Sequence, residues 1–449
     1  MRPPKAPPSL ELGALEPVER GAATLPDGRY LHWDELRHRS PPEGIASVEQ
    51  WWAATRLARR FAAVPVAPMS AVLGQRFSFV ETATIREALH RFDRENVSKV
   101  LADALGDADA ITEYRVRALI EEAISSSAIE GARPTTRDLA RTMVREGRPP
   151  TTKDERMIVN NWRAMQRIVE LREEERPLVL TDLLELHRIL GEVALDVPDG
   201  AGELRKPEHD VHVADGEGVV WHLPPPAIDP SGRLPPLGDR VQALLEFANG
   251  EADEGAAFIH PVLRAIICHF WLGYEHPFRD GNGRIARALF YWVMLANGYE
   301  MAEFLSISGP IDRKPTAYYR AFAYVETDDG DLTYFILHQL AVLEEAHRDL
   351  LDHLKRRAKH QGELARAIAG FDELNHRQRA LMQEAARHPL ETYTIEGHAT
   401  ASRVHYLTAR SDLKKLVELG YLTEERAGKG KRFAPSKRLA RLVKSGRAD

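Results

Sequence analysis

Apolar residues recur every three or four positions along most of this chain, which is the spacing of one face of an α-helix. The spacing predicts an N-terminal helical region followed by a series of longer helices. Helices are expected over residues 48–64, 84–105, 111–131, 155–175, 181–193, 238–250, 260–274, 284–298, 313–326 and 331–359. We therefore expect a mainly α fold.

One internal segment breaks the helical spacing. Between Val211 and Trp221, valines alternate with polar residues, the stretch ADGEG supplies turn residues, and Pro224 ends the pattern. Alternation on both sides of a turn is typical of a β-hairpin. The sequence therefore predicts one short hairpin within the helical core.

The last part of the chain, after about Gly370, shows a different order of elements. The pattern predicts a helix, a second helix or turn, a long amphipathic helix, and then two strands with Gly428 and Gly430 in the turn between them. This order is typical of a winged helix-turn-helix. We expect four parts: an N-terminal helical region at 1–110, a larger helical core at 111–345 including a helix at 111–131, a helical linker at 346–374, and a winged helix domain at 375–449.

Charge separates the tail from the body. From Asn375 to Asp449 there are 16 Lys and Arg residues against 8 Asp and Glu, a net charge of +8, whereas the preceding 374 residues carry −14 of the chain's net −6. A basic module on an acidic body suggests a partner of its own. The sequence leaves open whether that partner is DNA or a protein.

Composition limits the class of protein. A chain of 449 residues with 43% hydrophobic and 29% charged residues is typical of a soluble globular protein of two or three domains. Its only cysteine, Cys268, lies in an apolar stretch and fits a buried role in a reducing compartment. The N-terminus has no apolar signal region, and no apolar run of membrane-spanning length occurs, so a cytoplasmic location without membrane contact is expected.

The stretch HPFRDGNGRIAR, at residues 276–287, carries the most unusual chemistry in the chain. Gly281 and Gly283 precede a helix, and a helix N-terminus presents unpaired N–H groups and a partial positive charge. Asn282 lies between these glycines, and Arg284 and Arg287 lie one turn apart at the same helix end. The segment therefore predicts a cradle for phosphates.

Two side chains of the same stretch suggest catalysis. Asp280 supplies a hard oxygen ligand for Mg²⁺, which bridges phosphate oxygens. His276 has the side chain whose ordinary pKa suits proton abstraction from a hydroxyl near neutral pH. Each residue alone also has an ordinary reading as a turn, cap or solvated side chain; the combination is far more specific.

The stretch resembles the defining motif of the Fic family of protein nucleotidyltransferases, H-x-F-x-D/E-G-N-G-R-x-x-R. His276, Phe278, Asp280, the Gly-Asn-Gly triplet and both arginines match every fixed position. The resemblance extends over about residues 110 to 345, and it implies a Fic-type helical core whose hairpin is a flap that pairs with an extended target segment. The expected fold is thus a Fic-type helical core with a short β-hairpin flap and a C-terminal winged helix-turn-helix.

The resemblance implies an enzyme that transfers AMP from ATP, with Mg²⁺, to a Ser, Thr or Tyr hydroxyl of a target protein. In that scheme His276 is the base, Asp280 holds the metal, the backbone of Gly281, Asn282 and Gly283 binds phosphates together with Arg284, and Arg287 orients the γ-phosphate. Phe278 would anchor the loop. Tyr318 and Tyr319 are candidates for lining the adenine pocket, although tyrosines at helical spacing are commonly core residues.

A second short pattern is similar to the family's inhibitory motif, S/T-x-x-x-E-G/N. Here Ser126, Glu130 and Gly131 occupy its fixed positions, N-terminal to the core. On a helical wheel Glu130 lies at the edge of the buried stripe, and its own helix offers it no cation. The resemblance suggests Arg287 as its partner. The chain would then be autoinhibited, and removal of AMP from modified targets is a related expectation.

A second reading competes with the enzyme. In it, the core senses nucleotide and the tail acts as a DNA-binding transcriptional regulator through the helix SRVHYLTARSDLKKLVELGYL. The sequence does not identify the target protein, the nucleotide moiety transferred or the oligomeric state, for which a homodimer stays open.

Overall fold

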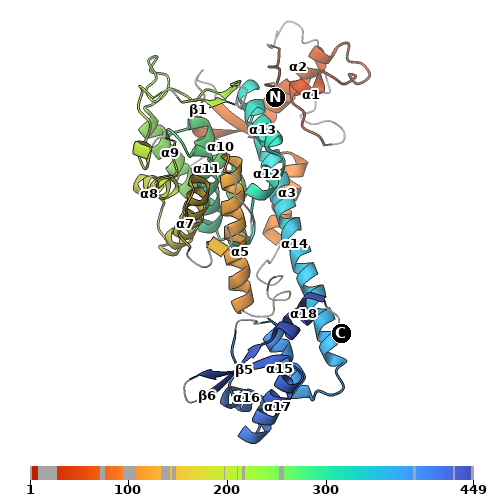
Figure 1. The fold of residues 1–449 in the computed structure, drawn as a ribbon. Coiled ribbons are helices and arrows are strands. Elements are labelled where there is room, and N and C mark those ends of the chain that lie inside the picture. The colour runs from red at the N-terminus through yellow and green to blue at the C-terminus, as the bar shows by residue number, and fades with distance from the viewer. Residues whose placement is uncertain are drawn as a thin grey trace. The chain divides into compact units, whose positions relative to one another are not determined.

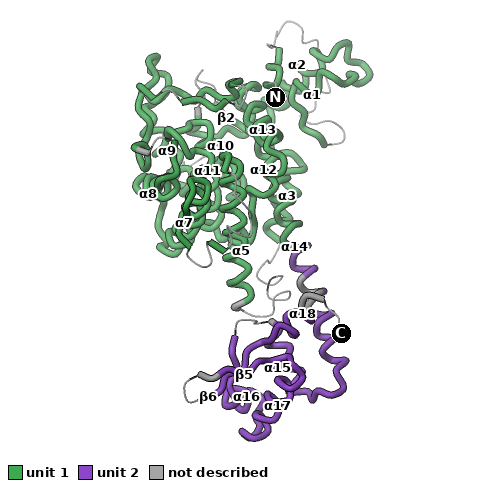
Figure 2. The backbone as a smooth tube through the Cα atoms, in the orientation of Figure 1, with its two compact units in different colours: residues 1–102, 107–350 green, residues 103–106, 351–449 purple. Residues whose placement is uncertain are grey.

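The computed structural model of the chain describes residues 3–8, 28–70, 76–94, 101, 108–132, 142–143, 148–196, 198–209, 211–214, 218–251, 257–387, 391–427 and 430–445. The chain forms two compact units (Figure 2), one of residues 1–102 with 107–350 and the other of residues 103–106 with 351–449. It is mainly helical with small antiparallel hairpins, which confirms the fold class expected from the sequence.

The first unit contains the N-terminal region and the helical core (Figure 1). Its N-terminal elements are α1 (Trp33–Leu36), α2 (Val48–Ala62), β1 (Ala63–Ser70), β2 (Arg76–Val80) and α3 (Ala83–Arg94). The core elements are α5 (Ala108–Ile129), α7 (Lys153–Glu173), α8 (Leu180–Gly191), the 3₁₀ helix η2 (Pro198–Gly200), β3 (Val213–Ala214), β4 (Val220–His222), α9 (Leu237–Asn249), α10 (Pro261–Glu275), α11 (Asn282–Ala296), the 3₁₀ helix η3 (Glu300–Phe304), α12 (Ser308–Arg313), α13 (Pro315–Thr327) and the first part of α14 (Thr333–Ala369), whose residues from 351 on belong to the second unit.

Helices α10 and α11 form the centre of the core, with α5, α7 and α9 around them (Figure 1). The sequence predicted a single apolar stripe on α11. Instead, every residue from Arg284 to Leu295 is buried, because α5, α7, α8 and α10 all contact this helix. A helix that is covered on all sides holds its N-terminus rigidly.

Helix ends follow local sequence rules. Thr152 and Glu155 form a capping box at the start of α7, and Gly250 ends α9 in the left-handed conformation. Gly131, with φ of 89°, adopts the left-handed conformation just beyond the last residue of α5 and so ends the helix. The end of α5 is therefore fixed close to Glu130.

The N-terminal region is not purely helical, contrary to the prediction for residues 1–110. Strands β1 and β2 pair antiparallel, with Ala63 opposite Val80. The stretch RFSFV alternates, and its Phe77 and Phe79 are buried while Arg76 is exposed. This period of two is a strand signal that the strong helical spacing on either side obscured.

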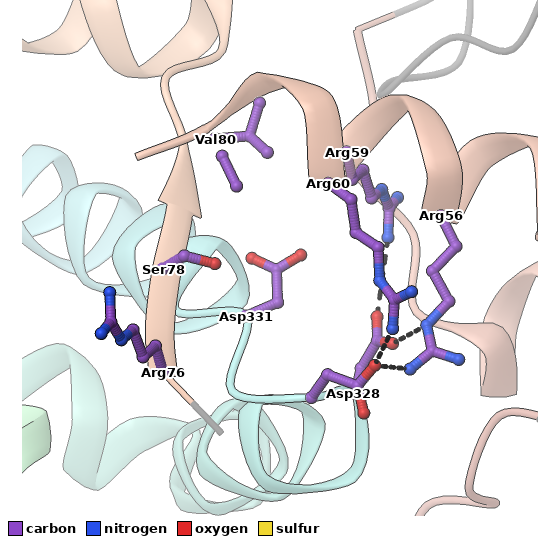
Figure 3. A pocket seen from close by; sticks show the side chains of 10 residues that line it. Arg56, Arg59, Arg60, Arg76, Ser78, Val80, Asp328 and Asp331 are labelled. Carbon is purple, nitrogen blue, oxygen red and sulfur yellow. Dashed lines mark hydrogen bonds and ion pairs between the residues drawn. The ribbon is translucent and has the colours of Figure 1, made fainter. Parts of the chain in front are cut away.

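An ionic network packs this N-terminal region against the turn between α13 and α14 (Figure 3). Arg56 pairs with Asp328 at 3.1 Å and also with Asp329, and the buried Arg59 stacks over Tyr30 at 3.6 Å. The network surrounds a space of about 350 Å³, here termed the N-terminal cavity. It is lined by Arg56, Arg59, Arg60, Ala63, Arg76, Ser78, Val80, Asp328, Asp329 and Asp331.

The second unit contains α15 (His376–Arg387), α16 (Ile395–Ser402), α17 (Tyr406–Glu418), β5 (Leu422–Ala427), β6 (Gly430–Pro435) and α18 (Lys437–Ser445). Strands β5 and β6 pair antiparallel. The hydrophobic core of this unit includes Leu413 and Phe433. Helix α18 was not predicted. Gly428, assigned to the turn between the strands, lies outside the described residues. The interpretation of this unit as a winged helix remains a proposal.

No helix in the described part of the chain combines the length and the apolar character needed to cross a membrane.

Candidate active site

The loop between α10 and α11 is braced from inside. Phe278 is fully buried and its ring stacks on His187, with 3.7 Å between ring centroids. The side-chain amide of Asn282 donates to the Phe278 carbonyl and accepts from the Phe278 N–H, both at 2.9 Å. Asn282 therefore shapes the loop with its side chain, leaving only its backbone for an anion.

His187 on α8 adds a second brace that sequence reasoning missed. Its Nε2–H donates to the Asp280 carbonyl at 2.9 Å, and its Nδ1 accepts from the Gly202 N–H at 2.9 Å. These two bonds define the neutral tautomer, and burial lowers the pKa of the ring to about 4. No local motif links His187 to a loop some 90 residues later, so sequence spacing carried no signal for it.

Helix α11 begins two residues earlier than Arg284, where the sequence analysis placed its start. Gly281 is its N-cap, with φ of 81°, a conformation that favours glycine, and the helix runs from Asn282. The first N–H groups of a helix have no intrahelical acceptor. Here they border a cavity of about 610 Å³, termed the motif cavity, which Gly281, Asn282 and Gly283 help to line.

His276 lies at the other end of the loop, on the wall of the same cavity. It caps α10 in the left-handed conformation, and its Nδ1–H donates to the Gly273 carbonyl at 3.0 Å. This bond leaves the lone pair on Nε2. Burial lowers the pKa of the ring to about 4, so His276 is neutral at physiological pH and can accept a proton at Nε2.

Asp280 also lines the motif cavity. One carboxylate oxygen accepts from the Gly281 N–H at 2.5 Å and the other from the Asp196 N–H at 2.9 Å. A carboxylate has about four lone-pair positions, so both oxygens keep acceptor capacity. Two backbone donors therefore fix its orientation.

Arg284 does not reach the cavity wall as the sequence suggested. Its guanidinium is buried behind the loop, where Nη1 donates to the Leu190 carbonyl at 3.2 Å and Nη2 lies 3.8 Å from Asp280. Nε has no partner in the described part of the chain. The positive charge of Arg284 therefore influences the cavity indirectly, through Asp280 and through the backbone between Asp280 and Arg284.

Arg287 is fastened to the end of α5. Its Nε donates to the Ser126 hydroxyl at 2.8 Å, and its Nη2 donates to the Ser126 carbonyl at 2.9 Å and to Glu130 Oε1 at 2.8 Å. The guanidinium is 1% exposed and the Glu130 side chain 25% exposed. The structure thus brings Arg287 to Ser126 and Glu130, which precede it in the sequence by 161 and 157 positions.

Glycine at position 283 is what admits Glu130. A Cβ atom placed there would collide with the Glu130 carboxylate and come within 3.1 Å of Arg287 Nη1. The carboxylate therefore lies directly against the first turn of α11, where an anion is favoured. It occupies the cradle as an anion supplied by the chain itself.

Charge stabilises this placement. Burial alone would raise the pKa of Glu130, but Arg287 and then Arg284 outweigh it and hold that pKa below its usual value. The same pairing, against the opposing effect of burial, raises the pKa of Arg287. Arg287 Nη1 still lacks an acceptor among the described residues, so the arginine retains capacity for a second anion.

The remaining walls come from the hairpin and from α13. Strands β3 and β4 pair antiparallel, as predicted, with Val213 opposite His222. His222 anchors the hairpin by donating from Nε2 to the Tyr274 carbonyl at 2.8 Å. Tyr318 and Tyr319 both line the motif cavity, and the Tyr318 hydroxyl lies 2.9 Å from His269 Nε2.

Comparison with known proteins gives a family for this region. Residues 177–294 match the model of the Fic/DOC family. A Drosophila virilis protein named protein adenylyltransferase Fic is 33% identical over 123 residues, which is 27% of this chain and 21% of that protein. The Drosophila melanogaster protein of the same name is 32% identical over 123 residues. The chain thus spans about a fifth of the length of the curated relatives it matches.

Solved structures align over a larger share of the chain. A Fic family protein from Desulfovibrio desulfuricans G20 aligns over 79% of this chain and 94% of its own, with a TM-score of 0.48 and 22% identity. A Fic domain containing signaling protein from Bacteroides thetaiotaomicron aligns over 62% of this chain and 97% of its own, with a TM-score of 0.42 and 21% identity.

Proposed function

We propose, from the match of residues 177–294 to the model of the Fic/DOC family, that the chain is a protein adenylyltransferase. It transfers AMP from ATP to a Ser, Thr or Tyr hydroxyl of a target protein. The observation that carries the proposal is the motif cavity, in which a neutral histidine, a carboxylate and a helix N-terminus meet. These are a base, a metal ligand and a phosphate cradle within one space.

In this reaction the target hydroxyl oxygen attacks the α-phosphorus of ATP while His276 Nε2 takes the hydroxyl proton. The bond from the α-phosphorus to the bridging oxygen breaks, and pyrophosphate leaves. The backbone N–H groups at the start of α11 hold phosphate oxygens, and Arg287 binds the γ-phosphate once it is free of Glu130. The flap β3–β4 aligns an extended target segment beside His276.

The cofactor Mg²⁺ fits the residues present. No group of three or more His, Cys, Asp or Glu side chains suited to a metal occurs in the described residues. Mg²⁺ at nucleotide sites is commonly held by one or two carboxylates together with phosphates, and the fixed, cavity-lining Asp280 meets that need. When bound, the ion would neutralise charge on the departing pyrophosphate.

The contact between Glu130 and Arg287 supports a second part of the proposal, autoinhibition. Glu130 competes for the guanidinium that the γ-phosphate needs, and its carboxylate lies against Gly283 in the cradle. ATP can then bind only in an unproductive arrangement. Hydrolytic removal of AMP from modified targets, with Glu130 positioning the attacking water, is a related activity of the inhibited form.

The test is transfer of label to protein. Purified chain is incubated with a cell lysate, Mg²⁺ and ATP labelled on either the α- or the γ-phosphate. Adenylyl transfer labels protein from the α-labelled but not from the γ-labelled nucleotide. Label from γ-ATP would indicate phosphoryl transfer instead, and no label with either nucleotide, even after Glu130→Gly, would reject the proposed activity.

The second unit supports an alternative, a nucleotide-sensing regulator that binds DNA. Arg403, Arg410 and Lys414 are exposed in and before α17, on a module with net charge +8. The exposed Tyr406 and Leu407 on the same helix instead favour a protein partner. An electrophoretic shift of duplex DNA that weakens with salt would support the regulator, and no shift at low salt would favour the protein partner.

A further inference from the structure

Arg205 is a buried arginine that lies outside the motif cavity. It is 7% exposed, and it is not among the described residues that line the cavity. It precedes the flap in sequence, and burial lowers the pKa of its guanidinium. A buried arginine without a carboxylate bonded to it is unusual, so its partners need an explanation.

The partners of Arg205 are backbone carbonyls at the end of α10. Nε donates to the His276 carbonyl at 2.8 Å, and Nη2 donates to the Glu275 carbonyl at 3.2 Å. The Arg205 backbone N–H donates to the Pro277 carbonyl at 2.8 Å. Carbonyls at a helix C-terminus have no intrahelical donor. Here Arg205 supplies a donor to each of three consecutive carbonyls.

These bonds hold a conformation that His276 does not adopt readily. The residue has φ of 47° and ψ of 57°, a left-handed backbone that side chains with a Cβ disfavour. In this conformation the ring turns back so that Nδ1–H reaches the Gly273 carbonyl. The direction of the Nε2 lone pair therefore depends on the backbone that Arg205 fixes.

The same guanidinium also holds the flap. Its Nη2 donates to the Pro225 carbonyl at 2.5 Å, just beyond β4. The described ladder between β3 and β4 is very short, so the hairpin depends on such anchors. A second buried arginine, Arg240, reinforces the first by donating to the Pro226 carbonyl and pairing with Glu275.

We propose that Arg205 is a positioning residue for the transfer reaction. It sets the base, His276, in a fixed relation to the flap along which the target segment lies. This proposal rests on the proposed function, because it assigns to Arg205 the alignment of hydroxyl and base. Arg205 touches neither nucleotide nor target, so its loss affects the chemical step and leaves ATP binding intact.

The kinetic test uses Glu130→Gly protein as the active parent. Arg205→Ala lowers the rate of transfer at saturating ATP by about a hundredfold, because an error of about 1 Å in alignment has that effect. The KM for ATP changes less than about twofold. Arg205→Lys gives an intermediate rate, since one ammonium replaces only part of the fork. Arg233→Ala, which removes an exposed arginine after the flap, leaves the rate unchanged.

Chemical rescue distinguishes alignment from general damage. Guanidinium ion at low millimolar concentration fills the space left in Arg205→Ala and restores part of the lost rate, but it does not accelerate the parent or Arg205→Lys. A rescued rate with an unchanged KM is the signature of a lost positioning contact. No rescue together with a raised KM would overturn the proposal.

A readout independent of activity follows the His276 ring itself. Histidine side-chain NMR of the wild-type chain, with the His276 signal assigned by its loss in His276→Gln, is expected to show Nδ1–H and a pKa far below 6.5. In Arg205→Ala, and in part in Arg205→Lys, that pKa moves toward 6.5 as the ring loses its fixed, buried place.

The outcomes separate the two proposals. If the Glu130→Gly parent transfers no AMP, the proposed function fails while the NMR titration still tests the hold of Arg205 on His276. If Arg205→Ala does not fold, as judged by its melting curve, Arg205→Lys carries the test. A folded Arg205 variant with the parental rate and the parental His276 titration overturns the proposal.

Discussion

Two cavities of the first unit are built from the same side chains, arginines and carboxylates, and they use them differently. In the N-terminal cavity the aspartates are all engaged: Asp328 accepts from Arg56 and Tyr334, Asp329 pairs with Arg56 and Arg60, and Asp331 accepts from Tyr30 and the Thr333 N–H. No histidine is among the described residues that line it.

In the motif cavity the pairing is incomplete. Glu130 pairs with Arg287, yet its side chain stays 25% exposed and Arg287 Nη1 lacks an acceptor among the described residues. A neutral histidine and a helix N-terminus complete the wall. Saturated pairs hold two segments together, whereas a single partly exposed pair can be exchanged for another anion. Buried arginine alone therefore does not indicate a binding site.

The largest difference between the cavities is expected on removing one side chain from each. In the Glu130→Gly parent, His276→Ala lowers transfer by at least about a thousandfold, because general base catalysis contributes on that order. ATP binding is retained, since only the proton acceptor is lost. Arg60→Ala, from the N-terminal cavity, leaves transfer unchanged. Near-parental labelling by His276→Ala would show that the base is another group.

The next difference is expected in stability. Asp328 is 3% exposed on its side chain, and Asp328→Ala leaves Arg56 Nε and the Tyr334 hydroxyl buried without their acceptor, so it costs about 3–5 kcal/mol. Glu130→Ala costs about 1 kcal/mol or less, because Ser126 still accepts from Arg287. Denaturant unfolding of both variants measures the two values. Equal losses would mean that the two pairs are equivalent.

The third expectation concerns activity alone. Glu130→Gly raises self-adenylylation by about a hundredfold, because release of Arg287 contributes a few kcal/mol of differential binding to the γ-phosphate. The measurement is the mass shift per chain with ATP and Mg²⁺. Adding Arg287→Ala to Glu130→Gly abolishes the gain, since the benefit runs through that arginine. Equal labelling by wild type and Glu130→Gly would make Glu130 an ordinary surface carboxylate.

The sequence was informative where function and local structure share one segment. The residues 276–287 contain a loop, a helix start and the chemistry together, so their spacing predicted a common site, and the structure places His276, Asp280 and Gly283 on one cavity. Glu130 was expected at the edge of a buried stripe, and its side chain is three-quarters covered.

Residue patterns alone did not reveal contacts between distant segments, and the family resemblance supplied only the pair of Glu130 and Arg287. His187 and Arg205 brace the loop from 71 to 93 positions away, and no periodicity encodes such pairs. Arg284 was assigned to phosphate because it follows the glycines, but the direction of a buried side chain depends on the helices around it. The β1–β2 hairpin and α18 were missed because short elements give weak patterns.

The smallest expected effect concerns pH, and it tests whether the motif cavity keeps its base neutral. Burial lowers the pKa of His276 to about 4, so the ring is uncharged above that value and able to accept a proton. Glu130 raises this pKa by its charge, hence the Glu130→Gly parent keeps the ring neutral over an even wider range. The rate constant for transfer at saturating ATP should therefore change less than about twofold between pH 5.5 and 8, falling only as the pH approaches 4. The profile is measured with ATP and Mg²⁺ saturating at each pH, and melting curves confirm that the protein stays folded. An acid limb centred near pH 6.5 would mean that the base is solvated like an ordinary histidine. The motif cavity would then not keep its base neutral by burial.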